Sequence, residues 1–125
     1  MYTTGVKAYF QTQVKTTSKE DLVVQLFEAA IRFLQQAKDD IEAKDYSGKG
    51  DRINRALNII NELDSSLNWQ QGGEIANNLH SLYLYCRKRL LTASLKLDTE
   101  IIDEVKSILE RLCSSFKEIS RPSQE

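Results

Sequence analysis

The sequence predicts an all-α protein, an antiparallel up-down four-helix bundle with a short mobile N-terminal arm or helix. Three observations support this fold class: apolar residues recur at helical spacing in four segments, polar or glycine-containing stretches separate them, and no segment alternates as a β-strand does. Short connections favour antiparallel neighbours. We expect residues 1–125 to form one domain, with an arm at 1–16, the bundle at 17–119 and a loose tail at 120–125.

The first long helix begins at a capping box formed by Thr17 and Glu20, which precede an apolar run. Its apolar residues form two adjacent rows at helical spacing, and this face is wider than one neighbouring helix needs. We therefore expect contact with two helices, or with one helix and a ligand. The rows are Leu22, Leu26, Ala30, Phe33, Ala37 and Ile41, and beside them Val23, Phe27, Ile31 and Leu34.

A polar connection is expected at residues 44–51, and a second helix follows it with Asp51 and Arg55 as an external i,i+4 pair. The Gly72-Gly73 pair then provides a hinge, and Glu74 falls in the first turn of a third helix. The apolar face of the second helix comprises Ile53, Leu57, Ile60, either Leu63 or Asp64, and Leu67.

The third helix has a stripe that must be buried, with the run 87–89 of basic residues on a solvated face near its C-terminal end. Asp98 is the expected N-cap of the fourth helix, and Pro122 lies beyond its end. The stripe of the third helix is Ile75, Leu79, Leu82, Cys86 and Leu90, and that of the fourth is Ile101, Val105, Ile108, Leu112 and Phe116.

The composition is that of an ordinary globular domain, with 41% hydrophobic and 28% charged residues and a formal net charge of -1. This charge balance argues against binding to nucleic acid. The sequence has no signal peptide and no apolar run of the ~20 residues that a membrane span needs, so we expect a cytoplasmic protein without membrane insertion. Cys86 and Cys113 lie among apolar residues and are expected to be buried.

No pattern of residues predicts catalysis, a metal or a cofactor. A di-metal carboxylate bundle needs Glu-x-x-His on two helices, whereas this chain has one histidine, His80, with Asn77 three residues before it. We expect His80 to be exposed or packed at an edge. The Gly72-Gly73 pair lacks the pattern of a phosphate-binding loop. The sequence therefore indicates a protein that is not an enzyme.

Aromatic residues point to a binding function, although two interpretations are open. Tyr83 and Tyr85 flank the stripe of the third helix, Trp69 lies at the hinge, and further aromatics lie in the arm. Such side chains suit partner interfaces, but they also suit the core and rim of a bundle. The arm is either a frayed end that packs on the core or a movable lid over an apolar groove that accepts a helix.

The chain resembles the FliS family of flagellar export chaperones over nearly its whole length. The resemblance is strongest in Ile-Ile-Asn-Glu-Leu-Asp-Ser-Ser-Leu-Asn at 59–68 and in Gly-Gly-Glu-Ile-Ala-Asn-Asn-Leu-His-Ser-Leu-Tyr-Leu-Tyr at 72–85. Leu-Phe-Glu-Ala-Ala-Ile-Arg-Phe-Leu-Gln-Gln-Ala-Lys at 26–38 also matches. The chain departs from the family pattern at Phe27 and Ala29, where tyrosine and glycine are frequent, at Asn68, where aspartate is, and at Phe116, where tryptophan is.

This resemblance implies a cytoplasmic chaperone that binds the disordered C-terminal segment of flagellin, prevents premature polymerisation and assists delivery to the type III export apparatus. The export gate and other flagellar assembly or regulatory proteins are further implied partners. Matching positions give the candidate partner-binding residues: Tyr2, Tyr9 and Phe10 in the arm, Phe27, Ile31 and Leu34 in the first long helix, and Ile75, Leu79, Leu82 and Tyr83 in the third.

Two other functions are compatible with a bundle of this kind. A regulatory adaptor could hold another flagellar assembly protein or an anti-sigma factor on the same bundle. Such an adaptor should still co-purify with its partner from cells that lack flagellin. A bundle enzyme or metal protein would contain a stoichiometric metal after purification.

Overall fold

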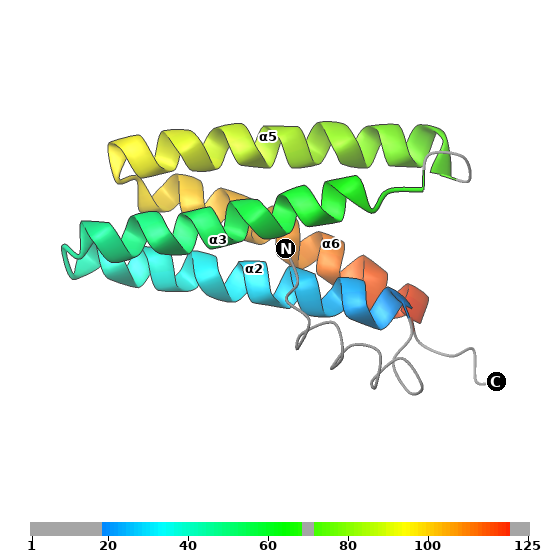
Figure 1. Cartoon of the computed structure of the whole chain (residues 1–125), viewed down its shortest axis with the longest axis horizontal. Helices are drawn as coiled ribbons and strands as arrows, with labels where there is room; N and C mark the ends of the chain where they lie inside the picture. The colour runs from blue at the N-terminus through cyan, green and yellow to red at the C-terminus, as the bar shows by residue number, and fades with distance from the viewer. Residues whose placement is uncertain (1–18, 69–71, 121–125) are drawn as a thin grey trace, which may run out of the picture.

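The computed structural model describes residues 19–68 and 72–120, which form four helices and no strand. Consecutive helices run in opposite directions, which confirms the predicted antiparallel up-down bundle (Figure 1). Thr17 of the predicted capping box, the arm aromatics, Trp69 and Pro122 lie outside the described residues. The helices are α2 (Lys19–Glu42), α3 (Tyr46–Ser65), α5 (Glu74–Lys96) and α6 (Thr99–Ser120).

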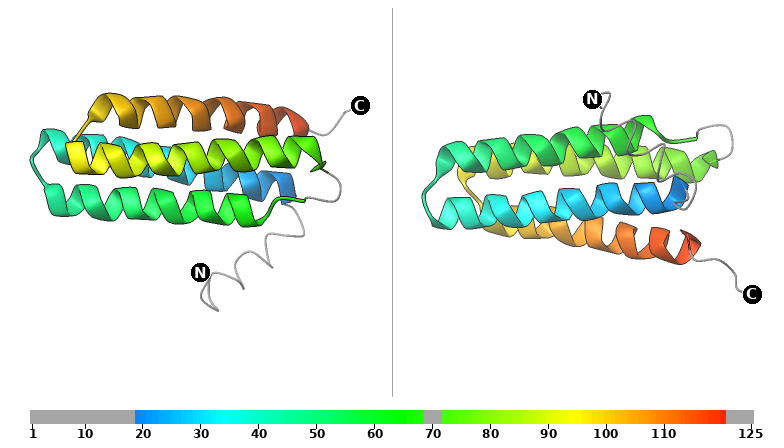
Figure 2. Two further views of the ribbon diagram at one scale, coloured as in Figure 1. Left: turned by 90° about the horizontal axis from the view of Figure 1, so that it is seen from above. Right: turned by 60° about the horizontal axis from the view of Figure 1, so that its bottom comes forward.

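The helices occupy the corners of a square, and each packs against two neighbours (Figure 2). Helices α2 and α5 each contact both α3 and α6, whereas α2 and α5 themselves face each other across the core. The backbone of α2 approaches its two neighbours closely, and fully buried alanines at 30 and 37 of α2 and 56 of α3 permit this approach. Helix α5 packs less closely on α3 and α6.

Aromatic rings join the helices at the centre of the core. Phe27 of α2 is fully buried, and its ring centroid lies 5.4 Å from that of Phe116 on α6 and 6.5 Å from that of Tyr83 on α5. Burial raises the pKa of Tyr83 above its ordinary value, so the ring behaves as a neutral core residue at any physiological pH. These three rings therefore tie together three of the four helices.

The buried face of α2 includes residues of both apolar rows that the sequence predicts, but not all residues of either row. Residues from both rows are buried, together with Val24, which belongs to neither. Residues at the margins of the rows, including Leu26 and Ile31, are only partly buried and pack against the core. Contact with both α3 and α6 explains why the apolar face is so wide.

The expected polar connection at 44–51 is wrong, because α3 already begins at Tyr46. Asp45 caps this helix, and its Oδ1 accepts a hydrogen bond from the backbone N–H of Gly48 at 3.0 Å. A Cβ atom at position 48 would lie 2.6 Å from Oδ2 of Asp45. The glycine thus makes room for the capping carboxylate instead of loosening a loop.

The predicted glycine hinge before α5 is confirmed, but the predicted burial of the first apolar residue of α5 is wrong. Gly73 has a φ of +50°, which favours glycine. Ile75 was expected to be buried, yet 69% of it is exposed. Ala76 is buried in its place, because its Cβ packs beside Gly72, where an added Cβ would lie only 2.9 Å away.

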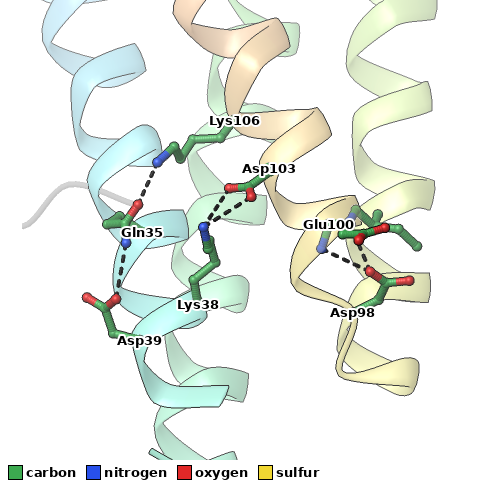
Figure 3. Close-up of polar contacts among 8 residues, drawn as sticks. Gln35, Lys38, Asp39, Asp98, Glu100, Asp103 and Lys106 are labelled. Atoms are coloured by element: carbon green, nitrogen blue, oxygen red, sulfur yellow. Dashed lines mark hydrogen bonds and ion pairs between the residues drawn. The ribbon is translucent and has the colours of Figure 1, made fainter. Parts of the chain in front are cut away.

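Asp98 caps α6 as predicted. Its Oδ1 accepts hydrogen bonds from the backbone N–H groups of Glu100 at 2.9 Å and Ile101 at 3.2 Å (the first is drawn in Figure 3). Asp98→Ala should therefore lower the free energy of unfolding by about 0.5–2 kcal/mol in urea denaturation. Asp98→Asn is the matched control, because it keeps the acceptor and should retain most of the stability. Equal losses in both variants would show that the cap does not depend on this oxygen.

Candidate functional site

The described residues contain no constellation typical of catalysis. No group of three or more His, Cys, Asp or Glu side chains in the described ranges could hold a metal ion. His80 is partly buried at an edge, where its Nδ1 lies 2.8 Å from Oδ1 of Asp64 and joins α5 to α3. Cys86 and Cys113 are buried, as predicted. Burial raises the pKa of Cys86 to about 12 and also raises that of Cys113, so both are protonated and poorly nucleophilic at neutral pH.

None of the helices in the described part of the chain combines the length and the apolar character that crossing a bilayer requires. The candidate functional site is therefore a binding site on the surface of the bundle.

The predicted partner-binding residues occupy three kinds of position. Phe27, Leu34 and Tyr83 are core residues, whereas Ile31, Leu79 and Leu82 are partly buried. Ile75 is exposed in the first turn of α5. The structure does not bring these residues into one continuous exposed surface. The three remaining candidates, Tyr2, Tyr9 and Phe10, lie outside the described residues.

One candidate residue, Ile31, lines an open pocket of about 360 Å³ between α2 and α6. Cys113 of α6 faces the same space, and an ion pair of 3.2 Å between Lys117 Nζ and Glu28 Oε2 links the two helices beside it. The pocket thus combines two apolar side chains with charged ones on its rim. Its lining residues are Glu28, Ile31, Arg32, Glu110, Cys113, Ser114 and Lys117.

Polar contacts close the same α2–α6 seam beyond this pocket (Figure 3). Lys38 Nζ lies 2.9 Å from Oδ1 of Asp103, and Lys106 Nζ donates to Oε1 of Gln35 at 2.5 Å. Gln35 in turn donates to Asp39 at 3.1 Å. The pocket thus lies nearer to the beginning of α2 and the end of α6 than these polar contacts do. We call this end of the bundle, where α2 and α5 begin and the Gly72-Gly73 hinge lies, the hinge end (Figure 1).

A second exposed apolar surface, not predicted from the sequence, lies on α5. Leu84, Leu91 and Leu95 are exposed, Leu95 to 88%. They are seven and four residues apart, so they form one stripe on the side of α5 that turns away from the core. This spacing is visible in the sequence and could have identified the stripe.

A polar network joins the other side of α5 to α6. Glu104 accepts a hydrogen bond from the hydroxyl of Tyr85 and another from Arg89 Nε at 2.9 Å. These two hydrogen bonds hold the pKa of Glu104 below its ordinary value. The carboxylate therefore stabilises the fold when it is ionised.

This network predicts a pH dependence of stability. A carboxyl group whose pKa is lowered by folding stabilises the protein above its unfolded pKa, and this contribution disappears as the pH falls through the folded value. The advantage of the native protein over Glu104→Gln should be present at pH 7 and decline as the pH falls below about 4.3, the ordinary pKa of glutamate. Urea denaturation of both proteins across this range measures it. A difference that does not change with pH would contradict the role of the ionised carboxylate.

The chain is similar to known proteins along nearly its whole length. The sequence model described as "Flagellar protein FliS" matches residues 2–123. The flagellar secretion chaperone FliS of Salmonella typhimurium is 40% identical, over 96% of this chain and 93% of its own length. The FliS chaperones of Escherichia coli and Bacillus subtilis are 33% and 30% identical, over 91% and 89% of this chain and 88% and 82% of their own lengths.

The described residues form an antiparallel four-helix bundle with exposed apolar side chains, an architecture that suits a helical binding protein. The match along nearly the whole chain specifies which one: the chain belongs to the FliS family of flagellar secretion chaperones. Its role is therefore in the biogenesis of the bacterial flagellum.

Proposed function

We propose that this chaperone binds the disordered C-terminal segment of flagellin in the cytoplasm, prevents its premature polymerisation and assists its delivery to the flagellar type III export apparatus. The protein acts by binding and is not an enzyme. The observation that carries the proposal is a set of separate apolar side chains that remain accessible on α5 and on the α2–α6 seam. Ile75 is exposed at the hinge end, Leu79 and Leu82 lie partly buried further along α5, and Ile31, near the middle of α2, lines the open pocket.

A disordered segment needs such a surface. Ordering it on binding costs roughly 2–5 kcal/mol of the gross interaction energy, which apolar contacts must offset. The apolar side chains on α5 and on the α2–α6 seam are separate from one another. They suit an extended segment that runs over the surface and contacts each of them in turn. A compact partner would need one flat patch.

The candidate residues in the core need a different explanation. Phe27, Leu34 and Tyr83 are inaccessible in the closed bundle, so they contact a client only if the helices separate. Helix α5 is the element that packs least closely on its neighbours. We propose that Ile75, Leu79, Leu82 and Ile31 make the direct contacts and that the three core residues hold the helices that carry them. The flagellar export gate is the further partner that we propose for the loaded chaperone.

Mixing experiments with flagellin test the proposed function. The chaperone should form a stable complex with monomeric flagellin in size-exclusion chromatography, and it should delay polymerisation. Flagellin that lacks its last ~40 residues, enough chain for the 1,000–3,000 Å² that coupled folding buries, should do neither. Equal binding of the truncated flagellin would show that the client segment is elsewhere.

The N-terminal arm offers a further prediction. Residues 1–16, the arm, lie outside the described residues, and α2, which follows them in the sequence, begins at the hinge end, where Ile75 of the proposed client surface is exposed. If it competes with flagellin for part of that surface, removing residues 1–16 should change the affinity for the flagellin segment at least threefold and leave the helical circular dichroism of the bundle intact. An unchanged affinity would overturn the lid role of Tyr2, Tyr9 and Phe10, but not the chaperone function.

A further inference from the structure

The outer face of α5 combines apolar and basic side chains. Leu84, Lys88, Leu91 and Leu95 follow one another at spacings of four, three and four residues, so all four lie on one stripe. The three leucines are exposed, and Lys88 lies among them. At 1.5 Å per residue the stripe is about 16 Å long. We call these four residues the outer α5 stripe.

The charge around this stripe has one sign. The segment 84–96 contains four basic residues and no acidic one. Arg89 is paired with Glu104 of α6, but Arg87, Lys88 and Lys96 make no ion pair within the described part of the chain. Of the nearby carboxylates, Asp64 pairs with His80. The stripe is thus an apolar surface with uncompensated positive charge in it and on both sides of it.

From this combination we propose that the outer α5 stripe is a second docking surface, for an amphipathic helix of a protein partner with acidic side chains along its apolar face. A helix on α5 would place apolar side chains between the leucines and a carboxylate against Lys88. The stripe begins nine residues, or two and a half turns, beyond Ile75, and Leu84 lies about 200° around the helix from Leu82, on another side of α5. Both surfaces can therefore be occupied at once.

Two other occupants fit this surface less well. A second copy of the chain would bring Lys88 and Arg87 against their own equivalents, and three leucines on one helix fall short of the ~800 Å² per partner of a stable interface. An anionic membrane is attracted by clusters of basic residues, each of which contributes about 1 kcal/mol. This segment has only three basic side chains without an ion pair in the described part of the chain, Arg87, Lys88 and Lys96.

Two synthetic peptides of about 15 residues, which span the stripe as helices, test the proposal. Both carry leucines at helical spacing, one with glutamates beside them and the other with lysines. The glutamate peptide should bind the full-length chaperone saturably, and at least tenfold more tightly than the lysine peptide. Leu91→Ser/Leu95→Ser should weaken this binding at least tenfold, whereas Ile75→Ser, an equally polar change at the other surface, should not. Lys88→Glu should reduce or reverse the preference between the peptides.

Four outcomes would overturn the proposal. In the peptide experiment these are equal binding of the two peptides and no binding of either. Self-association of the native chain that is lost in Leu91→Ser/Leu95→Ser would instead show that a second copy occupies the stripe, and sedimentation with vesicles of phosphatidylglycerol that depends on the same leucines would show that a membrane does. A final arm separates this surface from the client site: the glutamate peptide should still bind when the chaperone is saturated with the flagellin segment. Competition would assign the stripe to flagellin, and failure of flagellin binding alone would leave the stripe proposal standing.

Discussion

Replacing Phe27 by alanine is expected to lower the free energy of unfolding by about 3–5 kcal/mol, the largest loss that we predict for a single substitution. The side chain is fully buried, and its ring packs against those of Phe116 and Tyr83, so truncation leaves a cavity between α2, α5 and α6. A domain of this kind has about 5–15 kcal/mol in total. Urea denaturation followed by circular dichroism at 222 nm measures the loss.

The matched control is Tyr46→Ala, which truncates an aromatic residue that is 47% exposed in the first turn of α3. That variant should lose far less stability, since it removes little buried surface. A loss below about 1 kcal/mol for Phe27→Ala would contradict the central position of this ring, because cavity formation alone costs more.

Replacing Ile75 by aspartate should weaken binding of the flagellin C-terminal segment at least tenfold and leave the bundle folded. The side chain is 69% exposed in the first turn of α5, so a carboxylate there remains hydrated in the free protein. A client whose apolar side chains cover this position would have to desolvate the charge, and that cost appears directly in the dissociation constant. Fluorescence anisotropy of a labelled segment measures it.

Leu95→Asp is the matched control for this variant. It introduces the same charge on the same helix, at a leucine that is 88% exposed but belongs to the outer α5 stripe. Its affinity for the flagellin segment should equal that of the native protein. An equal loss in both variants would mean that the client covers the whole of α5, and no loss in either would remove α5 from the client surface.

Helix ends were predicted well where one residue determines them. Asp98 begins α6 because its carboxylate accepts backbone hydrogen bonds from residues two and three positions on, which is a local effect. The beginning of α3 was misjudged for the same local reason, since Gly48 suggested a loop although it accommodates the carboxylate of Asp45. The sequence alone does not distinguish a glycine in a loop from a glycine in the first turn of a helix. The positions of the neighbouring side chains do.

The rotation of each helix about its axis was harder to predict. Helical periodicity identifies an apolar face but does not say which of two adjacent rows points to the core, because neighbours on both sides determine this. Ile75 shows a related difficulty: it shares the side of α5 on which Cys86 and Ala93 are buried, yet it is exposed in the first turn of the helix. In α2, Val24 is buried and Val23 is only partly buried. Helices that are far away in the sequence determine which of the two side chains they cover.

The candidate site was only partly accessible from the sequence. Family resemblance identifies positions that matter, but it does not separate Phe27, which holds the core together, from Ile31, which lines a pocket. Separating them requires the arrangement of all four helices. The outer α5 stripe carried its own signal, because leucines at 84, 91 and 95 cannot lie on the same side as Cys86 and Leu90.

Titration calorimetry with a synthetic peptide of the last ~40 residues of flagellin, together with circular dichroism of the mixture, tests the central claim most directly. We predict saturable binding, a negative change in heat capacity, and more helix in the mixture than in the separate components, because the client folds as apolar surface is buried. Absence of binding at concentrations well above micromolar would contradict flagellin as the client, and the bundle would then serve another flagellar protein.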